Sequence, residues 1–253
     1  MADGWLQILV LFVVGVIAAA LNVVAGGGSF LTLPALIFLG LPPTVANGTN
    51  RVGLLIQNSG AVWNFTRRGF TQKTWLLLAA APAVAGALLG TWLAVQIGDR
   101  SFQRILAVIM IAVSLWTIWD PLGHRSLADK LPAMSRSRRA AFVLAFFGIG
   151  VWAGFIQAGV GFVILAATTW AGLNLVSGNA LKVLVVLTLT PVALAIFALA
   201  GKVDWSMGFA LGLGTGVGGQ IGVHLTVLRG HSWIKRVVMV VVVIMALRLW
   251  FYP

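Results

Sequence analysis

Two basic residues, Arg51 and Lys182, lie inside long apolar segments of the sequence, where a charged side chain is costly to bury. Such residues normally pair with an opposite charge. The chain has only five acidic residues, and all of them fall at the N-terminus or between apolar segments: Asp3, Asp99, Asp120, Asp129 and Asp204. Because no carboxylate accompanies either cation, the simplest partner is a mobile anion. The two residues therefore predict an anion site.

Both cations follow an asparagine within the first turns of an apolar segment, Asn47 before Arg51 and Asn179 before Lys182. The start of a helix offers unpaired N–H donors and the positive end of the helix dipole, which favours an anion. We expect further donors from side chains and glycine N–H groups nearby. These donors are Ser29, Thr49, Asn50, Gly27, Gly28, Gly159 and Gly161.

Structural roles remain open for the same residues. Arg51 and Lys182 could extend along their helices to a membrane interface, since both lie about two turns from a segment start. Asn47 and Asn179 could cap or bridge helices, a role compatible with ligand binding. Other polar residues either line a path or tie helices together: Asn22, Gln57, Asn58, Gln157 and Gln220.

The elements that would position these residues are apolar helices interrupted by glycine. Breaks are expected at 25–29 and 157–161, because glycine runs disfavour helix and leave backbone groups unpaired. Within a bilayer such groups are tolerated only against protein or a water-filled cavity. The short segments 29–41 and 161–173 that follow cannot cross a bilayer alone.

The composition indicates a membrane protein. Hydrophobic residues make up 60% of the chain and charged residues 9%, against about a quarter charged in a soluble domain. The net charge of +12 reflects basic residues between spans and not nucleic-acid binding. Residues 1–4 carry no Lys or Arg, so the first apolar segment is expected to be a span and not a cleaved signal peptide. With no cysteine in the chain and no carboxylate in a span, we expect no metal, no cofactor and no enzymatic activity.

The chain consists of two copies of one unit. A single constant shift aligns Gly27 with Gly159 and Asn47 with Asn179, without a gap between them. We therefore expect a first transmembrane repeat at 1–119, a basic cytoplasmic linker at 120–139 and a second repeat at 140–253.

Charge bias predicts how the repeats are oriented. The basic regions 67–73, 120–139 and 228–236 are expected in the cytoplasm. Corresponding loops of the two units then fall on opposite sides of the membrane, so the repeats are inverted. The predicted fold is an all-α, polytopic membrane protein in which each repeat has a broken-helix hairpin followed by three transmembrane helices. Inverted repeats with paired breaks are typical of secondary transporters.

The chain resembles the sulfite exporter TauE/SafE family in an ordered set of motifs. They are the glycine-rich run 25–34, the segment 40–49, Gly69, and the repeated pieces 159–162 and 172–182. The resemblance implies a multi-pass protein of the bacterial inner membrane that exports sulfite, sulfoacetate or a related sulfur oxyanion or organosulfonate.

The sequence thus predicts transport of a small sulfur-containing anion by alternating access between two repeats. An anion channel or an importer of sulfur oxyanions would share these features. The expected partners are the anion and the lipid bilayer, without nucleic acid. The substrate, the direction, the coupling ion and the oligomeric state, a homo-oligomer included, stay open.

Overall fold

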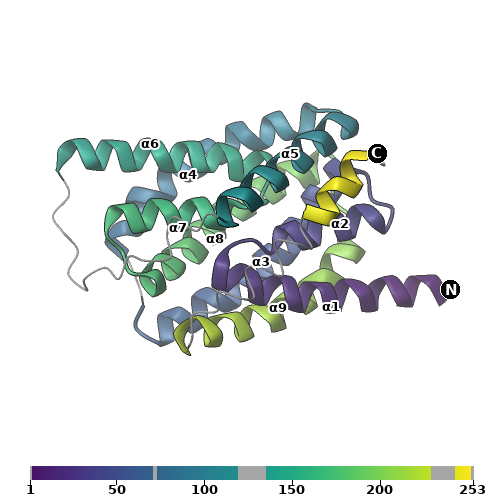
Figure 1. Ribbon diagram of the computed structural model, residues 1–253, viewed down its shortest axis with the longest axis horizontal. Helices are drawn as coiled ribbons and strands as arrows, with labels where there is room; N and C mark the ends of the chain where they lie inside the picture. The colour runs from purple at the N-terminus through teal and green to yellow at the C-terminus, as the bar shows by residue number, and fades with distance from the viewer. Residues whose placement is uncertain (1, 71–72, 119–134, 229–242, 252–253) are drawn as a thin grey trace.

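The computed structural model describes residues 2–70, 73–118, 135–228 and 243–251, and its ribbon is drawn in Figure 1. Most of the predicted linker, residues 120–134, and most of the basic region 228–236 lie outside these ranges.

Every regular element in the described ranges is a helix. The nine longer ones are α1 (Ala2–Ala25), α2 (Ser29–Phe38), α3 (Pro43–Arg67), α4 (Lys73–Gln96), α5 (Asp99–Ile118), α6 (Arg136–Phe155), α7 (Val160–Ala171), α8 (Leu175–Leu199) and α9 (Trp205–Leu228). A last helical segment covers residues 243–251. The all-helical prediction is confirmed.

Both predicted breaks are present. The first separates α1 from α2 at residues 26–28, where Gly26 takes a φ of 94° that side chains disfavour. The second separates α6 from α7 at residues 156–159, where Gly159 has a φ of 74°. It ends earlier than expected, because Val160 and Gly161 already belong to α7.

The helix boundaries recur along the chain with the predicted spacing. The shift that aligns Gly27 with Gly159 also carries both ends of α3 onto those of α8, and both ends of α4 onto those of α9. Turns with positive φ at Gly40 and Gly69 recur at Gly172 and Gly201. The sequence correspondence therefore extends to the local structure.

The first helix of each half packs against a helix of the other half: α1 lies along α9, and α6 lies along α4. Glycines make both contacts close. A Cβ atom on Gly218 would collide with the carbonyl oxygen of Val16, and one on Gly86 would collide with that of Phe147. The first helix of each half is thus held by a helix of the other half.

The protein is a polytopic membrane protein. Four helices in the described ranges have both the length and the hydropathy of a membrane span: Gly4–Val24, Trp75–Gln96, Arg136–Phe155 and Leu175–Leu199. α3 has the length as well, with 25 residues, but it carries Asn47, Asn50 and Arg51 among its buried side chains. A helix of this kind positions polar groups inside the molecule.

Candidate functional site

The two breaks contact each other inside the molecule. A Cβ atom on Gly161 would collide with the Cα atom of Gly26, so only glycine allows this approach. Beside them, the rings of Phe30 and Phe162 stack with centroids 6.4 Å apart. The breaks are therefore one feature of the fold, to which both halves contribute.

Arg51 extends from α3 to the end of α6 and is fully buried, at 0% exposure. Its Nη2 atom donates to the carbonyl oxygens of Ala153 at 3.1 Å and Gly154 at 2.6 Å, and Nη1 donates to Gln157 Oε1 at 3.1 Å. The guanidinium also lies 4.9 Å from the centroid of the Phe197 ring. The negative end of the α6 dipole stabilises a cation at this position.

Lys182 makes the corresponding contacts from α8 to the end of α1, at 3% exposure. Its Nζ atom donates to the carbonyl oxygens of Asn22 at 2.7 Å and Val23 at 2.9 Å, and to Asn179 Oδ1 at 2.7 Å. These acceptors match the three donors of an ammonium group. Neither cation reaches the exterior of the molecule, so the alternative in which both extend to the membrane interface does not describe this structure.

The two cations form a reciprocal arrangement. Arg51, in the first half, binds the last turn of the broken helix of the second half, and Lys182 does the reverse. The carbonyls of Asn22 and Gly154 are related by the same shift as Gly27 and Gly159, so they correspond between the halves. The two cations therefore bind corresponding carbonyls at the ends of α6 and α1, although Arg51 itself aligns with Val183 and not with Lys182.

Several buried polar atoms around the cations have no hydrogen-bond partner in the described ranges. Four are N–H donors and one is an acceptor: Asn50 Nδ2, Arg51 Nε, Gln57 Nε2 and Asn179 Nδ2, against Asn47 Oδ1. Unsatisfied buried polar groups are rare, and strain, an ordered water or a bound ion accounts for most of them. A surplus of donors is what an anion would satisfy.

The remaining atoms of these side chains are engaged. Asn47 Nδ2 donates to the carbonyl oxygen of Phe155 at 2.9 Å, which supports the bridging role of Asn47 at the end of α6. Asn50 Oδ1 accepts from the Thr32 hydroxyl at 2.7 Å. These bonds fix the orientation of each amide and leave the unpartnered atoms on its other end.

The other predicted residues divide into two groups. One group surrounds the breaks and is buried: Gly27, Gly28, Ser29, Gly159 and Gly161. Thr49 is also buried, but its hydroxyl accepts from the Asp204 backbone N–H at 2.9 Å, at the connection between α8 and α9. The structure thus places Thr49 in another contact of α3.

The carboxylates in the described ranges that make side-chain hydrogen bonds do so at helix starts. Asp99 accepts from Thr44 at the beginning of α3, and Asp204 accepts from the Met207 N–H at the beginning of α9. Within the same ranges, no group of three His, Cys, Asp or Glu side chains could hold a metal ion.

Sequence reasoning missed the main-chain acceptors. The carbonyl groups that end α1 and α6 serve as partners of Lys182 and Arg51, and Gly154 also accepts from the Thr91 hydroxyl at 3.2 Å. A signal was present, because each helix before a break must end with unpaired carbonyls. The sequence could not show which cation reaches which helix end.

Comparisons with known proteins agree with this architecture. The model of the sulfite exporter TauE/SafE family matches residues 11–249. A probable membrane transporter protein of Haemophilus influenzae is 28% identical over 96% of both chains. The probable membrane transporter protein YfcA of Escherichia coli K12 is 30% identical over 95% of this chain and 88% of its own.

A third relative is the probable membrane transporter protein ORF9 of a Sinorhizobium species, 30% identical over 94% of this chain and 90% of its own. No solved structure matches the chain significantly. On the family match and these relatives, the chain belongs to the sulfite exporter TauE/SafE family, whose members are membrane transporters and not enzymes.

Proposed function

We propose that this protein transports a small sulfur-containing anion, such as sulfite or an organosulfonate, past the point where its broken helices meet. The observation that carries the proposal is the pair of buried cations, Arg51 and Lys182, next to buried N–H donors without partners. The family name supports the choice of a sulfur oxyanion.

The cations and the donors have separate roles in this proposal. Arg51 and Lys182 provide the positive potential that offsets the cost of burying an anion. The N–H groups of Arg51, Asn50 and Asn179 that lack partners orient the oxygen atoms of the anion. The N–H groups at the starts of α2 and α7 complete the site, since helix starts favour anions. Asn47 holds the end of α6 beside the site through its bond to the Phe155 carbonyl.

The proposed movement is alternating access between two inverted repeats, 1–119 and 140–253, joined by a cytoplasmic linker at 120–139. The recurrence of helix bounds supports the repeats. In Figure 1, α1 begins near the right edge and α6 begins at the left, which supports the inversion. Paired discontinuous helices at a repeat interface are the usual site of substrate binding in such folds.

We propose export across the bacterial inner membrane. An inside-negative potential of 100 mV favours the exit of each negative charge by about 2.3 kcal/mol. Facilitated export therefore needs no carboxylate relay within the spans, and the sequence offers none.

A binding assay on the purified protein tests the proposal. Sulfite and a small organosulfonate should raise the unfolding temperature of the wild type, because a ligand at a hundred times its Kd stabilises the folded state by about 2.7 kcal/mol. This rise in unfolding temperature should disappear in Lys182→Met. It should remain in Lys202→Met, the matched control, whose Nζ atom donates to the Val95 carbonyl at the end of α4.

Two outcomes would refute the proposal. One is a wild type that no sulfur oxyanion or organosulfonate stabilises. The other is a folded Lys182→Met variant that responds to sulfite as strongly as the wild type does.

A further inference from the structure

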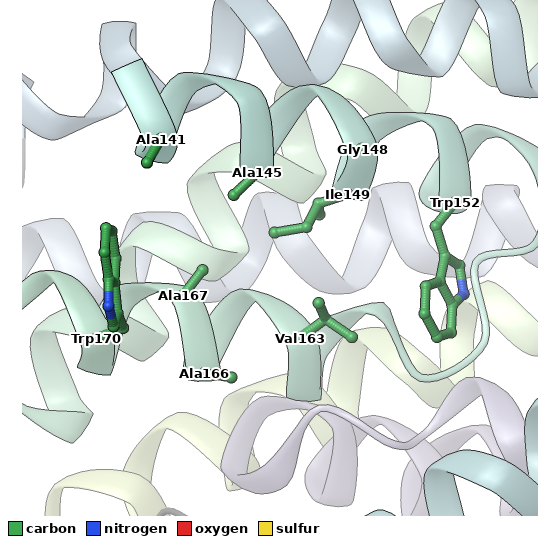
Figure 2. A pocket seen from close by; sticks show the side chains of 9 residues that line it. All are labelled: Ala141, Ala145, Gly148, Ile149, Trp152, Val163, Ala166, Ala167 and Trp170. Atoms are coloured by element: carbon green, nitrogen blue, oxygen red, sulfur yellow. The ribbon is translucent and has the colours of Figure 1, made fainter. Parts of the chain in front are cut away.

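An apolar groove of about 570 Å³ lies between α6 and α7, and none of its lining residues is a hydrogen-bond partner of Arg51 or Lys182. Figure 2 shows α7 running back along α6, with Ala141 and Trp170 at one end of the groove and Trp152 and Val163 at the other. Small side chains line its middle: Ala145, Gly148, Ala166 and Ala167. The groove is open because these residues leave the space between the two helices unfilled.

The dimensions of the groove match one leaflet of a bilayer. The residues that line it on α6 run from Ala141 to Trp152, which is about 16 Å of helix. The hydrocarbon core of a bilayer is about 30 Å thick, so the groove spans about half of it. α6 is one of the helices suited to crossing the membrane, and Leu144, on the same helix, is 70% exposed.

Exposed basic side chains lie at the end of the groove where α6 begins. Arg138 lies one turn before Ala141, donates from Nη2 to the Trp170 carbonyl oxygen at 3.1 Å, and stacks 5.3 Å from the Trp170 ring centroid. Arg136 and Arg139 are exposed on the same turn. The basic end would therefore face lipid headgroups while the apolar part lies among acyl chains.

The first half of the chain lacks this combination. The positions of the first half that correspond to Ala141, Ala145 and Gly148 hold larger side chains, and those that correspond to Arg138 and Arg139 hold no charge. In that order they are Leu9, Val13, Val16, Leu6 and Gln7. The helix and the break are common to both halves, but the small residues and the arginines are not. The groove is thus a local feature of α6 and not a requirement of the repeated fold.

We infer that this groove binds one anionic phospholipid, with an acyl chain between α6 and α7 and the headgroup phosphate at Arg138 and Arg139. Basic residues at the ends of spans recognise anionic headgroups, so arginines beside an apolar lining favour an occupant with an anionic head and an apolar tail. By the charge bias of the chain, the lipid belongs to the cytoplasmic leaflet.

Native mass spectrometry of the full-length protein with phosphatidylglycerol and phosphatidylcholine of equal chain length tests the inference. The wild type should retain phosphatidylglycerol in preference. Arg138→Leu with Arg139→Gln, the residues of the first half, should lower that preference by about fivefold for each arginine.

A second variant tests the acyl-chain part. Ala145→Val with Gly148→Val, again the residues of the first half, should abolish retention of the lipid. A Cβ atom on Gly148 meets no other atom within 4 Å, so the added methyl groups enter open space there. Leu144→Val, exposed on the same helix, is the matched control and should bind lipid as the wild type does.

The inference is overturned if the wild type binds both lipids equally, or if the variant with the filled groove retains phosphatidylglycerol. It is also overturned if filling the groove instead dissociates a dimer, because the groove would then bind a second copy of the chain. Sulfite binding, measured in parallel, reports on the transport site independently of the lipid result.

Discussion

Arg51 donates to the carbonyl oxygen of Gly154 over 2.6 Å, and this bond joins α3 of one half to the broken helix of the other. Lys182 makes the reciprocal bond to Asn22 at 2.7 Å. The two halves are therefore linked through their cations at both breaks. Any movement of one half against the other must carry these bonds along or break them.

Asn179→Asp is expected to separate anion binding from folding. Asn179 Oδ1 accepts from Lys182, so an aspartate here gives the cation an internal carboxylate and removes the unpartnered Nδ2 donor. The unfolding temperature should stay the same or rise. Sulfite affinity should fall by at least about tenfold, because a like charge then faces the ligand.

Asn64→Asp is the matched control for that variant. Asn64 Oδ1 accepts from Arg68 Nε at 2.8 Å. This is also a bond between an asparagine oxygen and a basic side chain, but it lies on the exposed part of α3. Sulfite binding measured by thermal shift should not change. Equal losses in both variants would mean that added negative charge alone weakens binding, and the site at Lys182 would lose its support.

Gly161→Ala should destabilise the fold. The added methyl group would collide with the Gly26 Cα atom, where backbone and not a flexible side chain must move. Overpacking of this kind costs about 1–3 kcal/mol. Thermal unfolding in detergent measures the effect, with Gly148→Ala as the control in open space. An unchanged unfolding temperature for Gly161→Ala would show that the two breaks do not meet as described.

Thr49→Val tests a residue that the sequence assigns to the anion site. Its hydroxyl accepts from the Asp204 N–H, so the variant should lose about 1 kcal/mol of stability and keep its sulfite affinity. Parallel denaturation and binding curves measure both quantities. A fall in affinity without a loss of stability would assign the hydroxyl to the ligand.

Sulfite transport is expected not to depend on sodium. In transporters with broken helices, unwound carbonyls and helix C-terminal ends commonly coordinate Na⁺. Here the carbonyls of Asn22, Val23, Ala153 and Gly154 already accept from Lys182 and Arg51. Replacing Na⁺ by K⁺ in a liposome assay should leave the rate unchanged. A strict requirement for Na⁺ would mean that another site binds the ion.

The local features of this fold could be predicted from the sequence. Glycine and its neighbours determine where a helix ends, so the breaks near Gly27 and Gly159 and the constant spacing between the halves are visible along the chain. The close packing at Gly86 and Gly218 follows for the same reason, since small residues let helices approach.

The long-range pairing could not be predicted. Arg51 lies in α3 and Ala153 in α6, far along the chain, and the carbonyl that accepts from Arg51 has no signature in residue type. The packing of α1 on α9 and of α6 on α4 brings these residues together, and it depends on contacts throughout the molecule. For the same reason the sequence grouped Thr49 with Arg51, although the Thr49 hydroxyl bonds to Asp204.

Sulfite efflux from liposomes containing Arg51→Met or Lys182→Met tests the central claim most directly. Both variants should be compared with the wild type at equal amounts of folded protein, with Lys202→Met as the control. Loss of one charge-assisted interaction should reduce efflux in each by at least about tenfold, while the control transports normally. Folded Arg51→Met and Lys182→Met proteins that both export sulfite at the wild-type rate would contradict the account.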